Sequence, residues 1–407
     1  MATVLIIGTL DTKGPETAYL ASHIREFGCS TLVLDSGILG EAVGITPDYS
    51  RQKVAQAAGS TIDALRNAGS RGKAVEQMLV GVRKLALELY AQGKIHGVTA
   101  LGGAEGTVLA AAAMKALPIG IPKLVVSPIA SGRRHFEPFV GTKDVLVMHS
   151  VVDILGLNAV SRQIFDTAAA AISGMSRAYA ERKPADTNGN KQIAATMLGN
   201  TTRPLMWIKD RLEPQGFDLV LFHANGVGGL AMEELFEQKM FDGVIDYTLS
   251  EIAGEVAGGF HAGGATRLEV AGKLGLPQIV IPGCVDFLVF GAKCEVPEKF
   301  RSRPSYYHNP EFTLVRVTKD EQLAIARDVA KKLNAAKGQV TLLVPLRGLS
   351  IPNHEKGGEF WAPDIDAAFR AELQGALLKE ISYHEVDAHV NSEEFASVVL
   401  ESALSIF

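Results

Sequence analysis

The chain of 407 residues is long enough for two to three domains, and its net charge of -5 provides no basic surface for a nucleic acid. Its three cysteines form no C-x-x-C pair, which excludes a thiolate zinc motif. No apolar run reaches the roughly 18 residues of a membrane span, and no basic segment precedes the apolar N-terminus. We therefore expect a cytoplasmic protein with neither a membrane nor a nucleic acid as its partner.

Short apolar runs alternate with longer helical patterns in the first half of the chain. The runs lie at residues 3–7, 31–35, 97–101, 123–127 and 144–148, and residues 73–92 carry apolar side chains at helical spacing. Strands that are apolar throughout and separated by helices are typical of a parallel sheet covered on both faces. A polar stretch rich in helix breakers at 181–191 then predicts a domain boundary.

The second half of the chain begins the same pattern again. Its apolar runs lie at 192–202, 218–229, 243–248, 278–283 and 341–348. Residues 6–35 are echoed in order by 196–223, and residues 115–127 are echoed by 272–283, as expected of a duplication. We therefore predict an α/β fold of two tandem Rossmann-like, doubly wound domains with largely parallel sheets, over residues 1–183 and 190–407.

The loops after the strands of the first domain are the expected ligand site, because such folds bind ligands at the carboxyl ends of their strands. Asp11, Thr12 and Lys13 follow the first strand. Lys13 can neutralise a phosphate, whereas Asp11 and Thr12 suit either a ligand or a helix cap. Asp35 ends the second strand, where it is either a ribose-binding acid or part of an Asx turn.

A glycine-rich turn, "GGAEGT" at 102–107, lies between the third strand and an alanine-rich helix. It is neither a P-loop nor a complete G-x-G-x-x-G motif. Either it is a tight turn with one glycine at positive φ, or its backbone approaches a phosphate at a helix N-terminus. The candidate residues are Gly102, Gly103, Ala104, Glu105, Gly106 and Thr107, with Ser131 and Gly132 as further hydroxyl and amide donors. Convergence of these loops on one sheet edge favours a nucleotide site.

The loops of the second domain are richer in acid–base groups. The candidate catalytic residues are His223, Asp246, Glu251, Arg267 and Asp286. Together they suit proton transfer or a small acidic substrate, although a histidine at a strand end is also a common structural residue. No H-E-x-x-H or other metal-binding spacing is present, so no metal ligand is assigned. The alanine-rich helix at 108–116 suits either a buried packing face or a dimer contact, and we expect a homo-oligomer, in the simplest case a homodimer.

Six segments carry a resemblance to a known family. They are "IGTLDTKGPE", "LGGAEGT", "IPKLVVSPIASG", "GTKDVLVMHSVVDILGLN", "FHANGVGGLAMEEL" and "VDFLVFG". In this order, from the first strand to about Phe395, the chain resembles the family of the tomato resistance protein against tomato mosaic virus. The resemblance implies an N-terminal half that binds ATP, with Mg²⁺, followed by a second α/β half.

The resemblance implies that residues 11–13 contact ATP and that the turn at 102–107 binds its phosphates. Ala104 and Glu105 stand where relatives have smaller residues, and a carboxylate at Glu105 would repel phosphates. Glu105 therefore faces away from them, binds the metal or alters specificity. The resulting hypothesis is an ATP-binding protein of unassigned activity. The alternative is an ATP-dependent or hydrolytic small-molecule enzyme whose acid–base site lies in the C-terminal domain or between the domains. Nucleotide in the C-terminal half would instead favour a sugar-nucleotide transferase.

Overall fold

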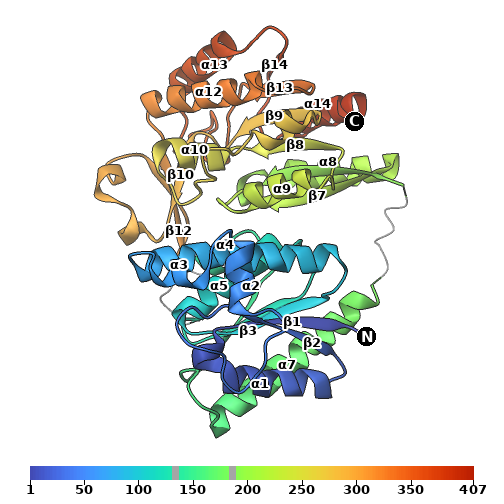
Figure 1. Cartoon of the computed structure of the whole chain (residues 1–407). Helices are drawn as coiled ribbons and strands as arrows, with labels where there is room; N and C mark the ends of the chain where they lie inside the picture. Colours follow the sequence, from blue (N-terminus) through green and yellow to red (C-terminus); the bar gives the residue numbers. More distant parts are fainter. Residues whose placement is uncertain (131–136, 183–188) are drawn as a thin grey trace. The chain divides into compact units, whose positions relative to one another are not determined.

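The apolar runs predicted in the first half are the strands of one parallel sheet. A computed structural model of the protein describes residues 1–130, 137–182 and 189–407, and its chain divides into two compact units, Met1–Pro184 and Ala185–Phe407 (Figure 1). The strands of the first unit are β1 (Thr3–Gly8), β2 (Ser30–Asp35), β3 (Gly97–Leu101), β4 (Lys123–Ser127) and β5 (Leu146–His149). They pair in the order β2-β1-β3-β4-β5, all parallel.

Helices cover both faces of this sheet. One face carries α1 (Leu10–Glu26) and α7 (Ala159–Ala180); the other carries α2 (Arg51–Ala57), α3 (Ile62–Arg66), α4 (Arg71–Ala91) and α5 (Ala104–Ala116), as Figure 1 shows, and the short α6 (Glu137–Val140) follows β4. The alanine-rich face of α5 is buried, with Ala110 and Ala113 fully covered in the same core as Met78 of α4. That face is therefore a packing face, and a homo-oligomer stays a prediction.

The strand order reverses beside β1. The chain runs from β1 outward to β2 at the edge and then returns to β3 on the other side of β1. At such a switch point the loops that leave the two neighbouring strands diverge and open a crevice at their carboxyl ends. The loops after β1 and β3 are therefore the expected walls of a ligand site.

The second unit repeats this topology. Its parallel strands are β6 (Lys191–Met197), β7 (Phe217–His223), β8 (Gly243–Thr248), β9 (Gln278–Gly283), β13 (Val340–Pro345) and β14 (Ser382–Val386), in the order β14-β13-β9-β8-β6-β7. The order now reverses beside β6, which lies between β7 and β8. The predicted α/β fold of two Rossmann-like domains is confirmed.

Helices cover both faces of the second sheet as well. One face carries α8 (Thr202–Leu212) and α14 (Glu393–Ile406); the other carries α9 (Gly228–Glu237), α10 (Ser250–Ala257), α11 (Val270–Leu274), α12 (Lys319–Asn334) and α13 (Pro363–Ala376). Single 3₁₀ turns lie at η1 (Gly199–Thr201), η2 (Glu213–Gln215), η3 (Lys293–Glu295) and η4 (Glu298–Phe300). Within the described residues, no helix has both the length and the apolar character that crossing a membrane requires.

A small antiparallel sheet, absent from the sequence prediction, is inserted between β9 and α12. It consists of β10 (Phe287–Phe290), β11 (Ser305–Asn309) and β12 (Phe312–Arg316), in the order β10-β12-β11. Its hairpin turn is formed by the Asn-Pro pair at 309–310, because the Asn309 carboxamide oxygen accepts the N–H groups of Glu311 and Phe312 at 2.9 Å each.

Candidate functional site

A cavity of about 590 Å³ lies at the switch point of the first unit. Three loops and two helices line it. The loops that follow β1, β2 and β3 contribute, in this order, Thr9, Asp11, Thr12 and Lys13; Gly37, Ile38 and Leu39; and Gly103, Ala104, Glu105 and Gly106. Helices α3 and α4 and the segment that connects them contribute Leu65, Arg66, Ser70, Arg71 and Ala74. This volume is in the range of roughly 300–1,000 Å³ that is usual for small-molecule sites.

The first turn of α1 borders this cavity without a side-chain cap. Thr9 occupies the N-cap position and makes no capping hydrogen bond, whereas the Thr12 hydroxyl donates to the Thr9 carbonyl at 3.2 Å. The Asp11 Oδ2 accepts the N–H of Gly40 at 3.0 Å, which ties down the loop after β2. The alternative in which Asp11 and Thr12 cap the helix is therefore wrong. The Leu10 N–H is instead accepted by Asp35 Oδ1 at 3.2 Å, and those of Thr12 and Lys13 by the Thr9 carbonyl at 3.1 and 2.8 Å.

Lys13 has a conformation that separates this first turn from the rest of α1. Its φ of -125° and ψ of 20° are not helical, so the main helix begins beyond it with Pro15 in its first turn, where proline is tolerated. Among the described residues the Lys13 ammonium has no hydrogen-bond or ion-pair partner, and its side chain is half-buried at the cavity wall. Lys13 is thus a cation available to an anionic ligand.

The glycines of the turn at 102–107 are explained by the space around their Cα atoms and not by a positive φ. None of Gly102, Gly103 and Gly106 has positive φ, so the tight-turn alternative is wrong in that respect. A Cβ at Gly102 would lie 2.6 Å from the Gly106 carbonyl carbon, which requires glycine for close backbone packing. A Cβ at Gly103 would meet nothing within 4 Å and would enter the cavity. Gly103 therefore keeps the cavity open.

The N-terminus of α5 opens onto the same cavity. Gly103 is its N-cap residue and has no side chain to accept from the first-turn N–H groups, which lack intrahelical partners. Ala104, Glu105 and Gly106 all line the cavity. Thr107 is buried instead, and its hydroxyl contacts the Gly102 carbonyl at 3.0 Å and the Ser127 hydroxyl at 2.7 Å. Thr107 therefore supports the turn and does not face a ligand.

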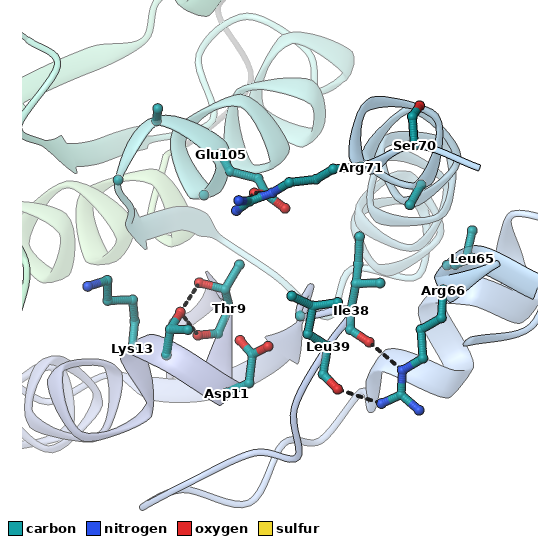
Figure 2. Close-up of a pocket in the computed structure, with 16 residues that line it drawn as sticks. Thr9, Asp11, Lys13, Ile38, Leu39, Leu65, Arg66, Ser70, Arg71 and Glu105 are labelled. Atoms are coloured by element: carbon teal, nitrogen blue, oxygen red, sulfur yellow. Dashed lines mark hydrogen bonds and ion pairs between the residues drawn. The ribbon is translucent and has the colours of Figure 1, made fainter. Parts of the chain in front are cut away.

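Glu105 has a partner that the sequence did not indicate. The Arg71 guanidinium of α4 donates to Glu105 Oε2, with a distance of 2.7 Å from Nε. The pair lies across the cavity between α4 and α5 in Figure 2. The Arg71 side chain is 78% exposed and that of Glu105 is 26% exposed, so water screens this ion pair. A local cation thus offsets the repulsion that a bare carboxylate would exert on phosphates.

The apolar side chains of the lining are Ile38, Leu39 and Leu65. Figure 2 shows Leu65 beside Arg66 and Ser70, across the cavity from Lys13, whereas Leu39 lies between Asp11 and Arg66. Leu39 is 71% exposed at this cavity. Arg66 holds this loop by donating to the carbonyls of Ile38 at 3.1 Å and Leu39 at 2.6 Å.

Asp35 lies outside the cavity lining. Its buried Oδ1 accepts the N–H groups of Gly37 at 2.9 Å and Leu10 at 3.2 Å, so its carboxylate forms an Asx turn. Burial raises the pKa of Asp35, although both backbone donors oppose that shift. Asp35 therefore positions the loops after β1 and β2, and the ribose-binding role expected for it is wrong here. Ser131 and Gly132 lie outside the described residues.

In the second unit, Arg267 gathers three carboxyl groups away from solvent. Its guanidinium donates to both oxygens of Asp246 at 2.7 and 2.8 Å and to Glu251 at 2.7 Å, and it lies 3.6 Å from Glu233. The Arg267 side chain is 0% exposed. All its charge is therefore compensated internally, and Arg267 cannot bind the small acidic substrate expected from the sequence.

Glu251 also fills the glycine-rich turn after β7. Its Oε1 accepts the N–H groups of Gly226 at 2.9 Å and Gly229 at 3.0 Å, beside the N-terminus of α9. A Cβ at Gly229 would overlap the Glu251 carboxylate, so the glycine is required for this close approach. An internal carboxylate thus occupies the position where a ligand anion would otherwise bind.

The expectation from the sequence that at least three of the five C-terminal candidates line one pocket is wrong. Asp246, Glu251 and Arg267 belong to the buried cluster, and Asp286 is buried elsewhere, accepting from the Ser350 hydroxyl at 2.7 Å. Burial raises the pKa of Asp286. His223, by contrast, lines a cavity of about 240 Å³. The physical reason is that carboxylates next to a buried guanidinium turn inward to compensate it.

Comparison with known proteins gives matches along nearly the whole chain. Residues 2–181 match the N-terminal domain of the Uncharacterised protein family (UPF0261), and residues 190–407 match its C-terminal domain. The chain belongs to the UPF0261 family.

Relatives of this UPF0261 chain include bacterial and plant proteins. A UPF0261 protein of Clostridium tetani is 39% identical over 405 residues, covering 99% of this chain and 98% of that protein. The ToMV resistance protein Tm-1(GCR237) of Solanum lycopersicum is 33% identical over 423 residues and confirms the predicted resemblance. This chain spans about half of that tomato protein, 55% of its length. A UDP-GlcNAc 2-epimerase structure from Methanocaldococcus jannaschii is 12% identical over 69% of this chain and 83% of its own, and its TM-score of 0.22 supports no inference.

The sequence interpretation of this UPF0261 chain missed several residues at both cavities. In the first unit these are Ile38, Leu39, Leu65, Arg66 and Arg71; in the second they are Asn200, His308, Asn309 and Phe312. Thr61 and Ser70, the N-caps of α3 and α4, are the residue types that predict helix starts next to the first group. The Asn-Pro turn at 309–310 similarly indicates the hairpin that carries His308.

Glu233, the third carboxyl group near Arg267, is buried. We predict that its burial makes the stability of the protein depend on pH. Burial raises the pKa of Glu233 from 4.5 to about 7 against the attraction of Arg267. The folded state then binds this proton more tightly than the unfolded state, so the free energy of unfolding falls as pH rises from about 4.5 to 7. The free energy of unfolding of Glu233→Gln should therefore rise by about 2–3 kcal/mol relative to wild type between pH 5 and pH 8, because one pKa unit is about 1.4 kcal/mol and part of the effect is already lost at pH 5.

Urea unfolding followed by tryptophan fluorescence tests this prediction, since both tryptophans, Trp207 and Trp361, lie in the second unit. Glu237→Gln, at an exposed position of the same helix, is the matched control and should track wild type. Equal pH dependence for Glu233→Gln and wild type would contradict the prediction.

Proposed function

We propose that the first unit binds ATP in the cavity at the β1/β3 switch point, with the phosphates at the N-terminus of α5. The observation that carries this proposal is the uncapped N-terminus of α5, left open by Gly103. Free first-turn N–H groups and the helix dipole favour an anion at this position. The unpartnered Lys13 ammonium at the same cavity adds a charge-assisted contact.

The apolar side chains of the lining support a nucleotide over a simple anion. The phosphates belong with Lys13 and the α5 N-terminus, and the base packs against Leu39 and Leu65. A base bound there would cover the side chain of Leu39, which is 71% exposed. The adenine nucleotide is the member of this class that the family resemblance implies.

The residues of the cavity fit Mg²⁺ only together with the phosphates. Mg²⁺ is usually held by one or two carboxylates plus phosphate oxygens and waters. Asp11 offers one carboxylate at the cavity wall, and among the described residues no three acidic, histidine or cysteine side chains form a metal group. Mg²⁺ bound with ATP supplies charge neutralisation, while Asp11 holds the ion beside the phosphates.

The alternative hypothesis, a small-molecule enzyme with its acid–base site in the C-terminal half, loses most of its candidate residues to buried contacts. Asp246, Glu251 and Arg267 compensate one another, and Asp286 is buried beside Ser350. His223 is the candidate that lines a cavity. The proposal is therefore nucleotide binding by the first unit, without an assigned reaction.

Replacing Lys13 by alanine should weaken ATP binding and leave the fold intact. A charge-assisted hydrogen bond is worth about 1.5–3 kcal/mol, which corresponds to a roughly ten- to hundred-fold loss of affinity. Calorimetric titration with MgATP measures this loss, and thermal unfolding checks the fold. Lys84→Ala, at an exposed position of α4 outside the cavity lining, should bind ATP as wild type does. Unchanged affinity for Lys13→Ala would remove Lys13 from the site.

A carboxylate at position 103 should compete with the phosphates directly. In Gly103→Asp the new side chain caps α5, which stabilises a helix N-terminus, and its Cβ meets no atom within 4 Å. We expect unchanged or higher thermal stability and at least a tenfold loss of ATP affinity. Gly174→Asp adds the same charge in α7, where a Cβ also meets nothing, and should retain binding. Normal ATP affinity in folded Gly103→Asp would contradict the proposal.

The ion pair between Arg71 and Glu105 should tune affinity without being required for it. Glu105→Gln releases Arg71 toward the phosphates and removes one repulsive charge, so ATP affinity should rise several-fold. Arg71→Gln leaves the Glu105 carboxylate uncompensated, so affinity should fall. Titrations with Mg²⁺ and with EDTA distinguish the ion pair from a metal-binding role for Glu105. A loss of affinity in Glu105→Gln that occurs only with Mg²⁺ would mean that Glu105 binds the metal.

A further inference from the structure

The second unit has its own cavity, at the place in its sheet that corresponds to the ATP site proposed for the first unit. It has a volume of about 240 Å³ and is lined by Leu198, Gly199, Asn200, His223, Asn225, His261, Phe287, Val289, His308, Asn309, Phe312 and Leu314. Residues 198–200 follow β6, beside which the strand order reverses. Ligands of doubly wound sheets bind at this edge. The β10–β12 sheet closes the cavity on one side.

The polar side chains of this cavity are imidazoles and carboxamides. Three histidines and three asparagines line it, and no lysine, arginine, aspartate or glutamate is among its described lining residues. Moving an ionised ligand here would remove it from water without a facing countercharge, which is costly. The buried cluster of the same unit has no unpaired cation for an anion either, because its one guanidinium already meets three carboxyl groups.

The three asparagines are arranged as hydrogen-bond donors. Their carboxamide oxygens already accept backbone N–H groups: Ile351 donates to Asn200 at 3.2 Å, Gly228 to Asn225 at 3.4 Å, and Glu311 and Phe312 to Asn309. The NH₂ group of each side chain is left to donate, while the oxygens of Asn200 and Asn225 can each accept one further bond. The cavity therefore has donors for the oxygen atoms of a ligand.

His261 adds a buried group that lacks a partner. Its Nδ1 is shielded from solvent and has no hydrogen-bond partner among the described residues. Burial, together with the nearby His223, lowers the pKa of His261 to about 4, so the ring is neutral at neutral pH. An unpaired buried polar atom is unfavourable, and pairing with a ligand hydroxyl or carbonyl group would remove that cost.

The apolar part of the lining suits the carbon skeleton of a small ligand. Phe287, Phe312 and Leu314 line the cavity beside the polar groups, and Phe312 is partly exposed. The volume lies below the roughly 300–1,000 Å³ of drug-sized sites. The occupant is therefore a small metabolite with both carbon faces and oxygen atoms.

We propose that this cavity is a second ligand site, which binds an uncharged, oxygen-rich molecule of monosaccharide or polyol size. The Asn200, Asn225 and Asn309 amides donate to its oxygens, and His261 pairs with one hydroxyl or carbonyl group. The site is independent of ATP binding in the first unit, and Gly103→Asp should leave it unchanged.

The test uses the full chain with histidine rings isotopically labelled for NMR. The uncharged probes are ribose, glucose and inositol, and the charged probes of similar size are gluconate and glucosamine. At least one uncharged probe should shift the His223, His261 and His308 resonances saturably below roughly 10 mM, ten times the usual upper KM. His384, on the edge strand β14, should not respond. Saturable binding of a charged probe alone, or of no probe, would overturn the proposal.

Two variants connect that binding to the named side chains. Asn309→Asp keeps an oxygen for the Glu311 and Phe312 N–H groups but removes the NH₂ donor, so affinity should fall at least tenfold with the hairpin preserved. His261→Phe removes the ring nitrogens and should have the same effect. His384→Phe is the matched control and should bind as wild type does. Wild-type affinity in both cavity variants, with unchanged tryptophan-monitored unfolding, would also overturn the proposal.

Discussion

The reversal of strand order beside the first strand of each sheet is the constraint on which both cavities depend. In the first unit it separates the loops after β1 and β3, and in the second it separates those after β6 and β8. Because the helices that follow parallel strands begin at this edge, their N-terminal N–H groups converge on the gap. In each unit these N–H groups therefore need hydrogen-bond acceptors, which are oxygen atoms either of the chain itself or of a ligand.

The two units meet this requirement differently. Glu105 lies in the first turn of α5 after β3, and Glu251 lies in the first turn of α10 after β8. Both pair with an arginine, but the Glu251 carboxylate is buried and accepts two backbone N–H groups at the start of α9. Glu105 stays near the surface with Arg71 and leaves the α5 N-terminus open. In the second unit the Glu251 carboxylate thus occupies the sheet edge at which the first unit has an open cavity.

Hydrophobic periodicity predicted the parallel strands because the central strands are apolar throughout. It did not predict β14, whose sequence SYHEV forms a half-exposed edge strand without an apolar run. The glycine spacing indicated correctly that the turn at 102–107 borders a cavity. Sequence pattern could not indicate that Arg267 points inward, because an ionisable residue at a sheet edge has the same spacing whether it faces a ligand or three carboxyl groups.

The burial of Arg267 also explains why the cavity of the second unit has no charged residue among its described lining residues, although the loops of that unit are rich in charged residues. Removing one partner from such a buried cluster leaves an uncompensated ion, at a cost of about 3–5 kcal/mol, so its members are held in place and cannot turn toward a ligand. The second cavity is consequently lined by imidazoles, carboxamides and phenyl rings. Among its described lining residues, the first cavity has the cations Lys13, Arg66 and Arg71 against the carboxylates of Asp11 and Glu105. The triphosphate proposed to bind there would carry more negative charge than this excess of described cations balances, which is consistent with the proposal that Mg²⁺ accompanies it. Charge at the two edges therefore separates the ligand classes that the two units can accept.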